Sequence, residues 1–367
     1  MSEIRLANPV LTKEMKDAAL QAMETEKFVL GESVYRFEEA LAQYLSVDQV
    51  ISVSSGTHAL QFALIAAGVT GGAPVLTVPN SFIATANAAL HAGGTPVFCD
   101  INPTTYTMDP TLIEARRGVP AVAIVPVHLF GHPCDMPRIA EEAERIGAPI
   151  IEDAAQAHGA TVDGTKVGAF GLAGCFSFYP SKNLTVGGDG GAVSTSDTRV
   201  ADTVRKLRDC GRTSRYEHDI IGYTARLNTV NAAIGLVQLR NLDQWNERRR
   251  TFALQYGAEL RDLPEFALPP SPTSRMNPVY HLYVVRARQR DKLKHHLAAA
   301  GVETAIHYPI PIHLQPAYRA LFGYHGGEFP HSEQLATEVL SLPCHPGLAR
   351  NDVRYICRTI RGFYEGG

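Results

Sequence analysis

Short apolar runs alternate with amphipathic stretches along the first two thirds of the chain. The runs are rich in β-branched residues and show no strict alternation, which is typical of strands buried on both faces. Strands are predicted at 49–53, 74–78, 96–99, 121–127 and 149–151, with helices from residue 58 and near 81–91, 110–116 and 135–146 between them. Further helices are predicted at 12–24, 35–45, 198–208 and 229–256. This rhythm predicts a βαβ series, and therefore a mostly parallel sheet with helices on both faces.

The pattern changes after about residue 262, where a proline-rich join occupies 263–272. Beyond it the elements are fewer and mixed. Strands are predicted at 279–286 and 302–307, and helices at 291–300, 332–340 and 352–364. We therefore predict a large domain over residues 1–260 and a smaller α+β domain over 261–367, which suits a chain of 367 residues.

Composition narrows the class of protein. A hydrophobic content of 45%, a charged content of 19% and a formal net charge of −3 describe an ordinary globular protein without a basic surface for nucleic acid. Neither an apolar leader nor a run long enough for a transmembrane helix is visible, so no membrane partner is expected. The six scattered cysteines are expected to be reduced thiols, and we predict a cytoplasmic protein.

Candidate chemistry is concentrated between Pro149 and Ser194. The apolar run that starts at Pro149 ends on Glu152 and Asp153, and ligands gather at the carboxyl ends of strands in open α/β sheets. Lys182 follows an aromatic run and precedes a glycine-rich segment, which makes it a candidate Schiff-base amine. An aspartate at a strand end is the partner that a pyridinium nitrogen needs. Asp153 and Lys182 are therefore the predicted catalytic pair.

A second candidate site follows the strand at 49–53, where Ser54-Ser55-Gly56-Thr57 leads into a helix. Free backbone N–H groups and the helix dipole make such a start an anion site. The same residues also fit a simple Ser/Thr cap of the helix. The local pattern leaves both interpretations open.

Four motifs in order, HLFGHPCDM, IIEDAAQAHGA, FSFYPSKNL and GDGGAV, resemble those of the DegT/DnrJ/EryC1/StrS family of sugar aminotransferases. The resemblance extends from FVLGESVYRFEEAL near the start to SLPCHPGL near the end. It implies the fold-type I architecture of enzymes dependent on pyridoxal 5′-phosphate, with a seven-stranded sheet in the large domain. It also implies a homodimer with shared active sites.

The resemblance assigns roles to individual residues. For the cofactor it implies contacts from Gly56, Thr57, Phe82, Asp153, Gln156, Ser177 and Lys182, with Lys182 forming the internal aldimine. Thr224 stands where the family usually has an asparagine that reaches the phosphate of the neighbouring subunit, so that contact is expected in altered form. Substrate contacts are expected from Tyr179 and from the HYPxPxH motif, which supplies His307, Tyr308 and His313. His128 is a weaker site candidate.

The expected reaction moves an amino group from L-glutamate, or glutamine, to a keto sugar carried on a nucleotide diphosphate. Two alternatives share the fold: a sugar dehydratase, whose members have histidine in place of the lysine, and a catalytically silent pyridoxal-binding protein. A nicotinamide enzyme is disfavoured because no GxGxxG follows the first strand. No metal-ligand spacing occurs, so no metal is expected. The charge cluster Glu247-Arg248-Arg249-Arg250 is interpreted as a solvated helix face.

Overall fold

The computed structural model describes residues 3–114, 118 and 120–365. The helices that precede residue 261 are α1 (Lys13–Thr25), α2 (Glu32–Leu45), α3 (Gly56–Ala66), α4 (Ala84–His91), α5 (Pro110–Glu114), α6 (Met136–Ile146), α7 (Thr198–Arg208) and α8 (Thr229–Leu260). The strands of this part are β1 (Gln49–Val53), β2 (Pro74–Thr77), β3 (Thr95–Phe98), β4 (Ala123–Ile124), β5 (Ile151–Asp153), β6 (Thr161–Val162), β7 (Thr165–Lys166), β8 (Ala173–Ser177) and β9 (Gly191–Thr195).

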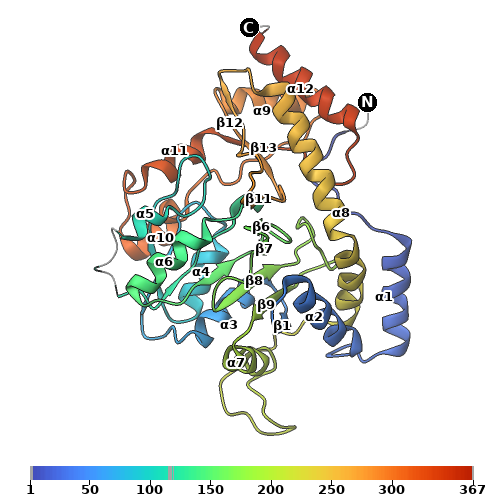
Figure 1. The fold of residues 1–367 in the computed structure, drawn as a ribbon, viewed down its shortest axis with the longest axis vertical. Helices are drawn as coiled ribbons and strands as arrows, with labels where there is room; N and C mark the ends of the chain where they lie inside the picture. The colour runs from blue at the N-terminus through green and yellow to red at the C-terminus, as the bar shows by residue number, and fades with distance from the viewer. Residues whose placement is uncertain (1–2, 115–117, 119, 366–367) are drawn as a thin grey trace.

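A central sheet organises these elements (Figure 1). Strands β3-β2-β4 form one hydrogen-bonded group and β5-β8-β9-β1 another. Parallel bridges from Ile124 to Ile150 and from Val127 to Asp153 join the groups into seven strands in the order β3-β2-β4-β5-β8-β9-β1. Only β9 runs against its neighbours β8 and β1. The predicted mostly parallel seven-stranded sheet is confirmed.

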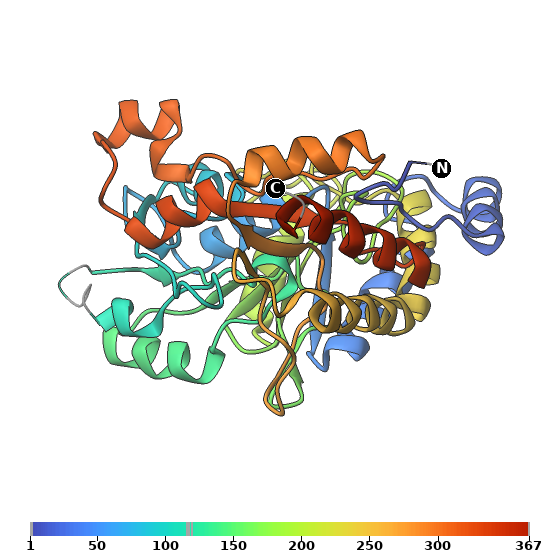
Figure 2. The same ribbon diagram turned by 90° about the horizontal axis from the view of Figure 1, so that it is seen from above.

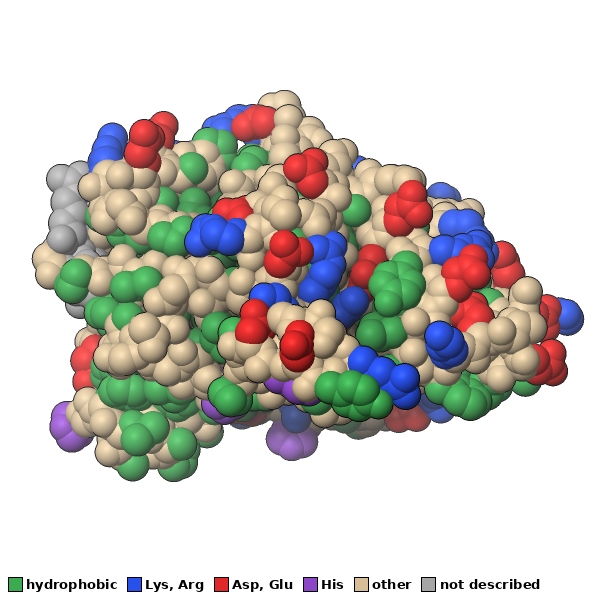
Figure 3. Space-filling model, turned by 90° about the horizontal axis from the view of Figure 1, so that it is seen from below, with side chains coloured by type: hydrophobic (Ala, Val, Ile, Leu, Met, Phe, Trp, Pro, Cys, Tyr) green, Lys and Arg blue, Asp and Glu red, His purple; other side chains and the backbone are tan. Residues whose placement is uncertain are grey.

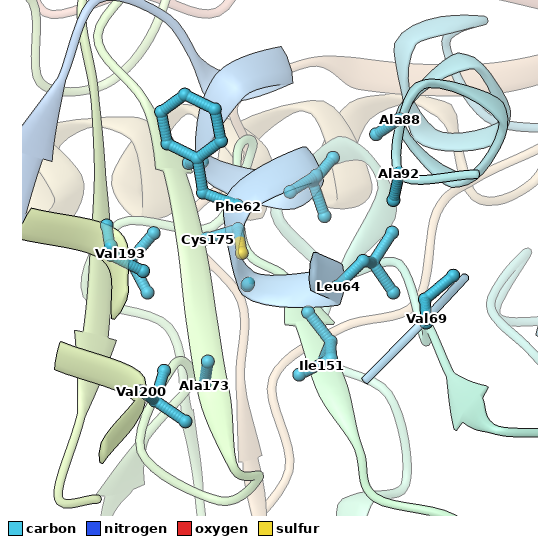
Figure 4. Packing of buried hydrophobic residues seen from close by; sticks show 14 of the residues in the cluster. Phe62, Leu64, Val69, Ala88, Ala92, Ile151, Ala173, Cys175, Val193 and Val200 are labelled. Carbon is cyan, nitrogen blue, oxygen red and sulfur yellow. The ribbon is translucent and has the colours of Figure 1, made fainter. Parts of the chain in front are cut away.

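Helices cover both faces of this sheet. On one face α3 and α7 pack over β5, β8 and β9, where Phe62, Ile151, Cys175, Val193 and Val200 form a fully buried cluster (Figure 4). On the other face α2 and the first half of α8 pack against Phe176, which lies in β8, and Phe178, which lies just after it. Both faces bury apolar area, which accounts for strands without polar alternation.

A second, antiparallel sheet, β10-β12-β13, lies at the far end of α8. The elements of this part are β10 (Phe266–Ala267), β11 (Met276–Asn277), β12 (Tyr283–Ala287), α9 (Arg290–Ala299), α10 (Pro316–Phe322), α11 (Pro330–Glu338), β13 (Val339–Leu342) and α12 (Arg350–Glu365). Short 3₁₀ turns lie at Leu129–Gly131 and Ile312–Leu314. Viewed from above, α9 and α12 lie over this sheet (Figure 2). The predicted domain division at residue 260 remains a prediction.

Several predicted elements differ in the structure. The strand expected at 302–307 is reduced to isolated bridges, Ile4 to Val302 and Ala305 to Ser341. The helix expected at 332–340 ends at Glu338, because Val339–Leu342 pairs with β12. The strand expected at 121–127 has ladder pairing only at Ala123–Ile124. The helix predicted near 110–116 is described only to Glu114.

The surface at the α7 end carries acidic and basic side chains interspersed, without one sign of charge gathering there (Figure 3). Within the described ranges, every helix is too short or too polar to cross a lipid bilayer. The cysteines are free thiols, and all except Cys210 are buried.

Candidate active site

Strand direction brings the predicted residues to one edge of the central sheet. Asp153 ends β5 and lies opposite Cys175 of the parallel strand β8, which ends at Ser177. Strand β1 is antiparallel to β9, which is antiparallel to β8, so β1 runs in the direction of β8. The turn that follows β1, with Gly56 and Thr57, therefore emerges at the same edge. A cavity of about 560 Å³ opens there.

Most of the predicted site residues line this cavity. They are Gly56, Thr57, Phe82, Asp153, Gln156, Ser177, Tyr179, Lys182, His307 and Tyr308. Thr224 and His313 do not line it. The structure thus gathers, in one space, residues separated by up to 252 positions from Gly56 to Tyr308. Their individual roles remain predictions.

Glycines let the turn before α3 lie directly on strand β8. A Cβ on Gly56 would lie 2.7 Å from the Cβ of Ser177, and a Cβ on Gly191 would lie 2.4 Å from the backbone of Ser55. The first intrahelical bond of α3 runs from the amide of Ala59 to the carbonyl of Ser55 (3.0 Å). The amides of Gly56 and Thr57 precede that bond, so they are free to bind an anion.

The Ser55 side chain also accepts a hydrogen bond from the amide of His58 (3.1 Å). The cap and the anion site inferred from the sequence are therefore compatible, because they use different amides of the same helix start.

The Asp153 carboxylate is held by its neighbours inside the cavity wall. Its Oδ2 accepts a hydrogen bond from the Thr85 hydroxyl (2.7 Å), and its Oδ1 accepts one from the amide of Ala155 (3.2 Å). Burial raises the pKa of Asp153, while these hydrogen bonds and the charge of Lys182 act in the opposite direction. An opposing cation at this position therefore favours the ionised carboxylate.

Lys182 follows a turn in which its amide donates to the carbonyl of Tyr179 (2.8 Å). Burial lowers the pKa of Lys182 to about 8, although the charge of Asp153 acts to raise it. Within the described ranges its Nζ has no hydrogen-bond acceptor or ion-pair partner. The amine is therefore available to react and is partly neutral near physiological pH.

Gln156 connects two segments that border the cavity. Its Oε1 accepts a hydrogen bond from the amide of Phe130 (2.8 Å), and its Nε2 donates to the Tyr308 hydroxyl (3.2 Å). Phe82 lies with its ring centroid 5.8 Å from that of Tyr308 and is 53% exposed. An aromatic face therefore remains open toward a bound ring.

His307 borders the cavity with its Nδ1 2.8 Å from the Ser341 hydroxyl. Burial, together with the nearby charge of Lys182, lowers the pKa of His307 to about 4. A neutral imidazole at this position can donate or accept one hydrogen bond without adding charge to the cavity.

His313, by contrast, lies in a separate cluster. Its ring is fully buried, packs against Phe329 at a centroid distance of 4.7 Å, and has its Nε2 3.0 Å from Glu333. His313, Glu328 and Glu333 could bring ligand atoms within 4.8 Å of one another, but both carboxylates already accept backbone N–H groups of 325–329. The structure gives His313 a packing role rather than a place in the cavity.

Thr224 lies on the loop between α7 and α8, which projects at the lower end of the molecule in Figure 1. It is exposed, with its hydroxyl 3.4 Å from the Cys210 sulfur. The predicted contact to a neighbouring subunit therefore involves an exposed residue that does not line this chain's own cavity. It stays a prediction.

His128 lies behind the site and is fully buried. Its Nδ1 accepts a hydrogen bond from the amide of Cys134 (3.0 Å), so its Nε2 carries the proton toward Glu152 (3.1 Å). Glu152 also accepts the amides of Gly168 (2.7 Å) and Phe170 (2.7 Å). These contacts fix the strand that carries Asp153, which makes His128 a supporting residue.

Sequence reasoning missed Thr85 and misread Arg249. Thr85 belongs to no motif, and its contact with Asp153 depends on the packing of α4. The prediction that Arg249 lies on a solvated face is wrong: the residue is buried, and its Nη1 donates to the carbonyls of Tyr280 (3.2 Å) and His281 (3.3 Å). A run of charges on one helix resembles a surface unless its distant partners are known.

A family model described as the "DegT/DnrJ/EryC1/StrS aminotransferase family" matches residues 9–361. The chain belongs to this family. It is therefore an aminotransferase of the family that its motifs resemble, and the resemblance is confirmed. The crystal structure of ntda from Bacillus subtilis, which is 30% identical to this chain with a TM-score of 0.90, contains the bound cofactor pmp.

Individual relatives agree over nearly full length. "Erythromycin biosynthesis sensory transduction protein EryC1" of Saccharopolyspora erythraea is 40% identical over 359 residues, 98% of each chain. The dTDP-3-amino-3,4,6-trideoxy-alpha-D-glucose transaminase of Streptomyces venezuelae is 39% identical over 363 residues, covering 99% of this chain and 95% of that one. The structure of S. venezuelae DesV with a ketimine intermediate has a TM-score of 0.94 at 37% identity, covering 100% and 99%. The fold-type I architecture is confirmed.

Proposed function

We propose that this aminotransferase binds pyridoxal 5′-phosphate at Lys182 and transfers an amino group from L-glutamate, or glutamine, to a keto sugar attached to a nucleotide diphosphate. The observation that carries the proposal is the convergence of the Lys182 amine and the Asp153 carboxylate on one cavity. The name of the S. venezuelae relative supports a nucleotide-linked sugar as the acceptor.

The residues present fit the cofactor group by group. The unpaired amides of Gly56 and Thr57, with the Ser177 hydroxyl beside them, would hold its phosphate. Asp153 would bind its ring nitrogen, and Lys182 would bind it covalently through Nζ. We assign its ring face to Phe82 and its phenolic oxygen to Gln156. When bound, this cofactor supplies an electron sink conjugated to the amine being transferred.

The chain's own groups then perform the proton chemistry. An amine with a pKa of about 8 is divided between its protonated and neutral forms near neutral pH. Lys182 Nζ can therefore take a proton from the donor carbon that carries the amine in one half-reaction. In the other half-reaction it can give a proton to the carbon that receives the amine. Asp153 supplies a fixed negative charge that would keep the ring nitrogen of the bound cofactor protonated.

The neighbouring polar groups supply recognition. His307 and Tyr308, which line the cavity, can hydrogen-bond sugar hydroxyls, and the exposed Tyr179 can stack against the sugar ring. We propose that a homodimer in the cytoplasm completes the site, with Thr224 reaching the partner subunit's cavity. The free thiols of the chain support a reducing compartment.

Reduction with borohydride tests the covalent assignment. The purified protein should be yellow, and reduction should fix one cofactor per chain on the peptide that contains Lys182. Lys182→Ala should abolish transamination while leaving a folded protein. Transamination by Lys182→Ala above background would refute the assignment of the amine.

The donor half-reaction separates the alternatives. Incubation with L-glutamate should convert the bound cofactor to its amine form, and a panel of keto-sugar nucleotides should then restore the yellow species. A yellow protein that glutamate does not convert would favour the silent alternative, and loss of water from the sugar without amination would favour the dehydratase.

A further inference from the structure

The cavity extends past the Lys182 site toward α8 and the N-terminal segment. This part of the wall includes Asn8, Trp245, Arg249, His281 and His345, which we call the α8 pocket. Its members come from four separate segments of the chain. They are nevertheless contiguous, because the Arg249 guanidinium donates to the carbonyls of His281 (3.3 Å) and of Cys344, the residue before His345.

The α8 pocket is adjacent to the proposed reacting amine. Asn183, next to Lys182, donates from its Nδ2 to the Oδ1 of Asn246 (2.8 Å). Asn246 and Arg249 are three residues apart and lie on the same face of α8. His281 lies within electrostatic range of both Lys182 and Arg249, and both charges, after burial, lower its pKa.

The positive charge of Arg249 lacks a carboxylate partner. Its side chain is 6% exposed, and burial lowers its pKa only to about 10, so it stays charged at neutral pH. Within the described ranges its hydrogen bonds all run from Nη1 to backbone carbonyls, and no aspartate or glutamate forms an ion pair with it. A buried cation that is solvated only by carbonyl dipoles favours an incoming anion.

Three nitrogens of the pocket are buried without a hydrogen-bond partner among the described residues: Arg249 Nε, His281 Nδ1 and His345 Nδ1. His345 Nε2 lies 3.1 Å from the carbonyl of Arg5 and carries the proton there, so its Nδ1 is an acceptor. The Arg249 Nε–H can only donate. His281 has no hydrogen bond that fixes its tautomer, so it can also present an N–H. Two available donors beside an uncompensated cation are the groups that a carboxylate or a phosphate requires.

We propose that Arg249 and His281 bind a carboxylate of the amino donor, an inference that rests on the proposed function. An α-carboxylate is attached to the carbon that carries the transferred amine, so it must lie close to Lys182. The diphosphate of a sugar nucleotide is separated from the aminated carbon by the sugar ring and would lie further from that amine. Proximity to Lys182 therefore favours the carboxylate over the diphosphate as the anion.

Binding of unreactive probes to the cofactor-loaded protein tests this inference. Glutarate carries two carboxylates and no amine, and dTDP and UDP carry the diphosphate, so calorimetry measures both without turnover. Arg249→Lys keeps the charge but removes the Nε donor of the fork. We expect it to weaken glutarate binding roughly tenfold to a hundredfold, as for loss of a charge-assisted hydrogen bond, and to change dTDP and UDP binding less than twofold.

A second variant avoids the backbone contacts of Arg249. Asn8 is exposed at the cavity wall, and Asn8→Asp places a negative charge there without removing a buried group. We expect severalfold weaker glutarate binding and a higher KM for the donor at unchanged kcat. Asn351→Asp, which makes the same charge change on exposed α12, is the matched control and should have no effect.

The outcomes separate the sources of the anion. Weaker dTDP or UDP binding with unchanged glutarate binding would overturn the proposal in favour of a diphosphate site. Unchanged binding of all three probes to folded Arg249→Lys would show that the pocket holds no substrate anion. Neither result would alter the borohydride test at Lys182, so this inference and the proposed function can fail independently.

Discussion

Replacing Lys182 with methionine should stabilise the cofactor-free protein at neutral pH. The folded structure lowers the pKa of this amine from its usual 10.5 to about 8, mainly through burial. A shift of one pKa unit corresponds to about 1.4 kcal/mol, so the full shift amounts to about 3 kcal/mol. The residue as a whole is half-buried beside the open cavity, so solvent screening reduces this figure and we expect a gain of about 1–3 kcal/mol.

The sign of the pH dependence follows from linkage. Because the folded pKa lies below the unfolded pKa, the unfolded chain binds more protons between about pH 8 and 10.5. Above pH 10.5 the amine is neutral in both states and does not destabilise the folded protein. Its destabilising effect grows as the pH falls and is complete below about pH 8. The advantage of Lys182→Met should therefore be largest below pH 8 and should shrink as the pH rises to 10.5.

Urea unfolding of the cofactor-free protein between pH 7 and 11 measures this difference. Lys182→Arg is the matched control, because arginine stays charged throughout this range. This variant should be destabilised, but its free energy of unfolding should not show the same dependence on pH. A difference between wild type and Lys182→Met that stays constant from pH 7 to 11 would refute the lowered pKa. Labelling of the amine by an acylating reagent should independently show half-maximal reactivity near pH 8.

Two further predictions concern the groups around the catalytic pair. Thr85→Val removes the hydroxyl that donates to Asp153 while keeping the shape, so cofactor affinity should fall roughly tenfold to a hundredfold; an unchanged dissociation constant in a cofactor titration would contradict this. Gly56→Ala should cost about 1–3 kcal/mol in the free energy of unfolding, because its Cβ would lie 2.7 Å from that of Ser177. Gly257→Ala, inside α8 with nothing within 4 Å of the new Cβ, should instead gain about 0.5–1 kcal/mol, and equal effects in the two variants would contradict the close-packing argument.

The sequence pattern predicted the central sheet well because strands buried on both faces appear as runs of consecutive apolar residues. The apolar runs at 49–53 and 74–78 are strands β1 and β2 within one residue. Placing Asp153 at a strand end was sufficient to put it at the ligand edge, because parallel strands share that edge. The pairing of Asp153 with Lys182 was predicted from that strand end and from the aromatic and glycine-rich segments around Lys182, and in the structure both residues line one cavity.

The features that sequence reasoning missed all depend on distant segments. Val339–Leu342 continues the apolar period of the preceding helix, and only its pairing with β12 makes it a strand. Arg249 belongs to a charged run and is buried by segments near residues 280 and 344. His313 lies in a motif associated with substrate, yet Phe329 and Glu333 enclose it. Tertiary contacts outweigh local composition at each of these positions.

One physical cause connects the two members of the catalytic pair. Burial penalises the charged form of any group, so it raises the pKa of Asp153 and lowers that of Lys182. Each charge opposes the shift of the other, which keeps the carboxylate able to ionise and the amine able to hold a proton. A site that was more exposed would leave Lys182 fully protonated and unreactive. A site that lacked the partner charge would neutralise both groups. The partly closed cavity at the edge of the sheet lies between these limits, which is the condition that acid–base chemistry at this lysine requires.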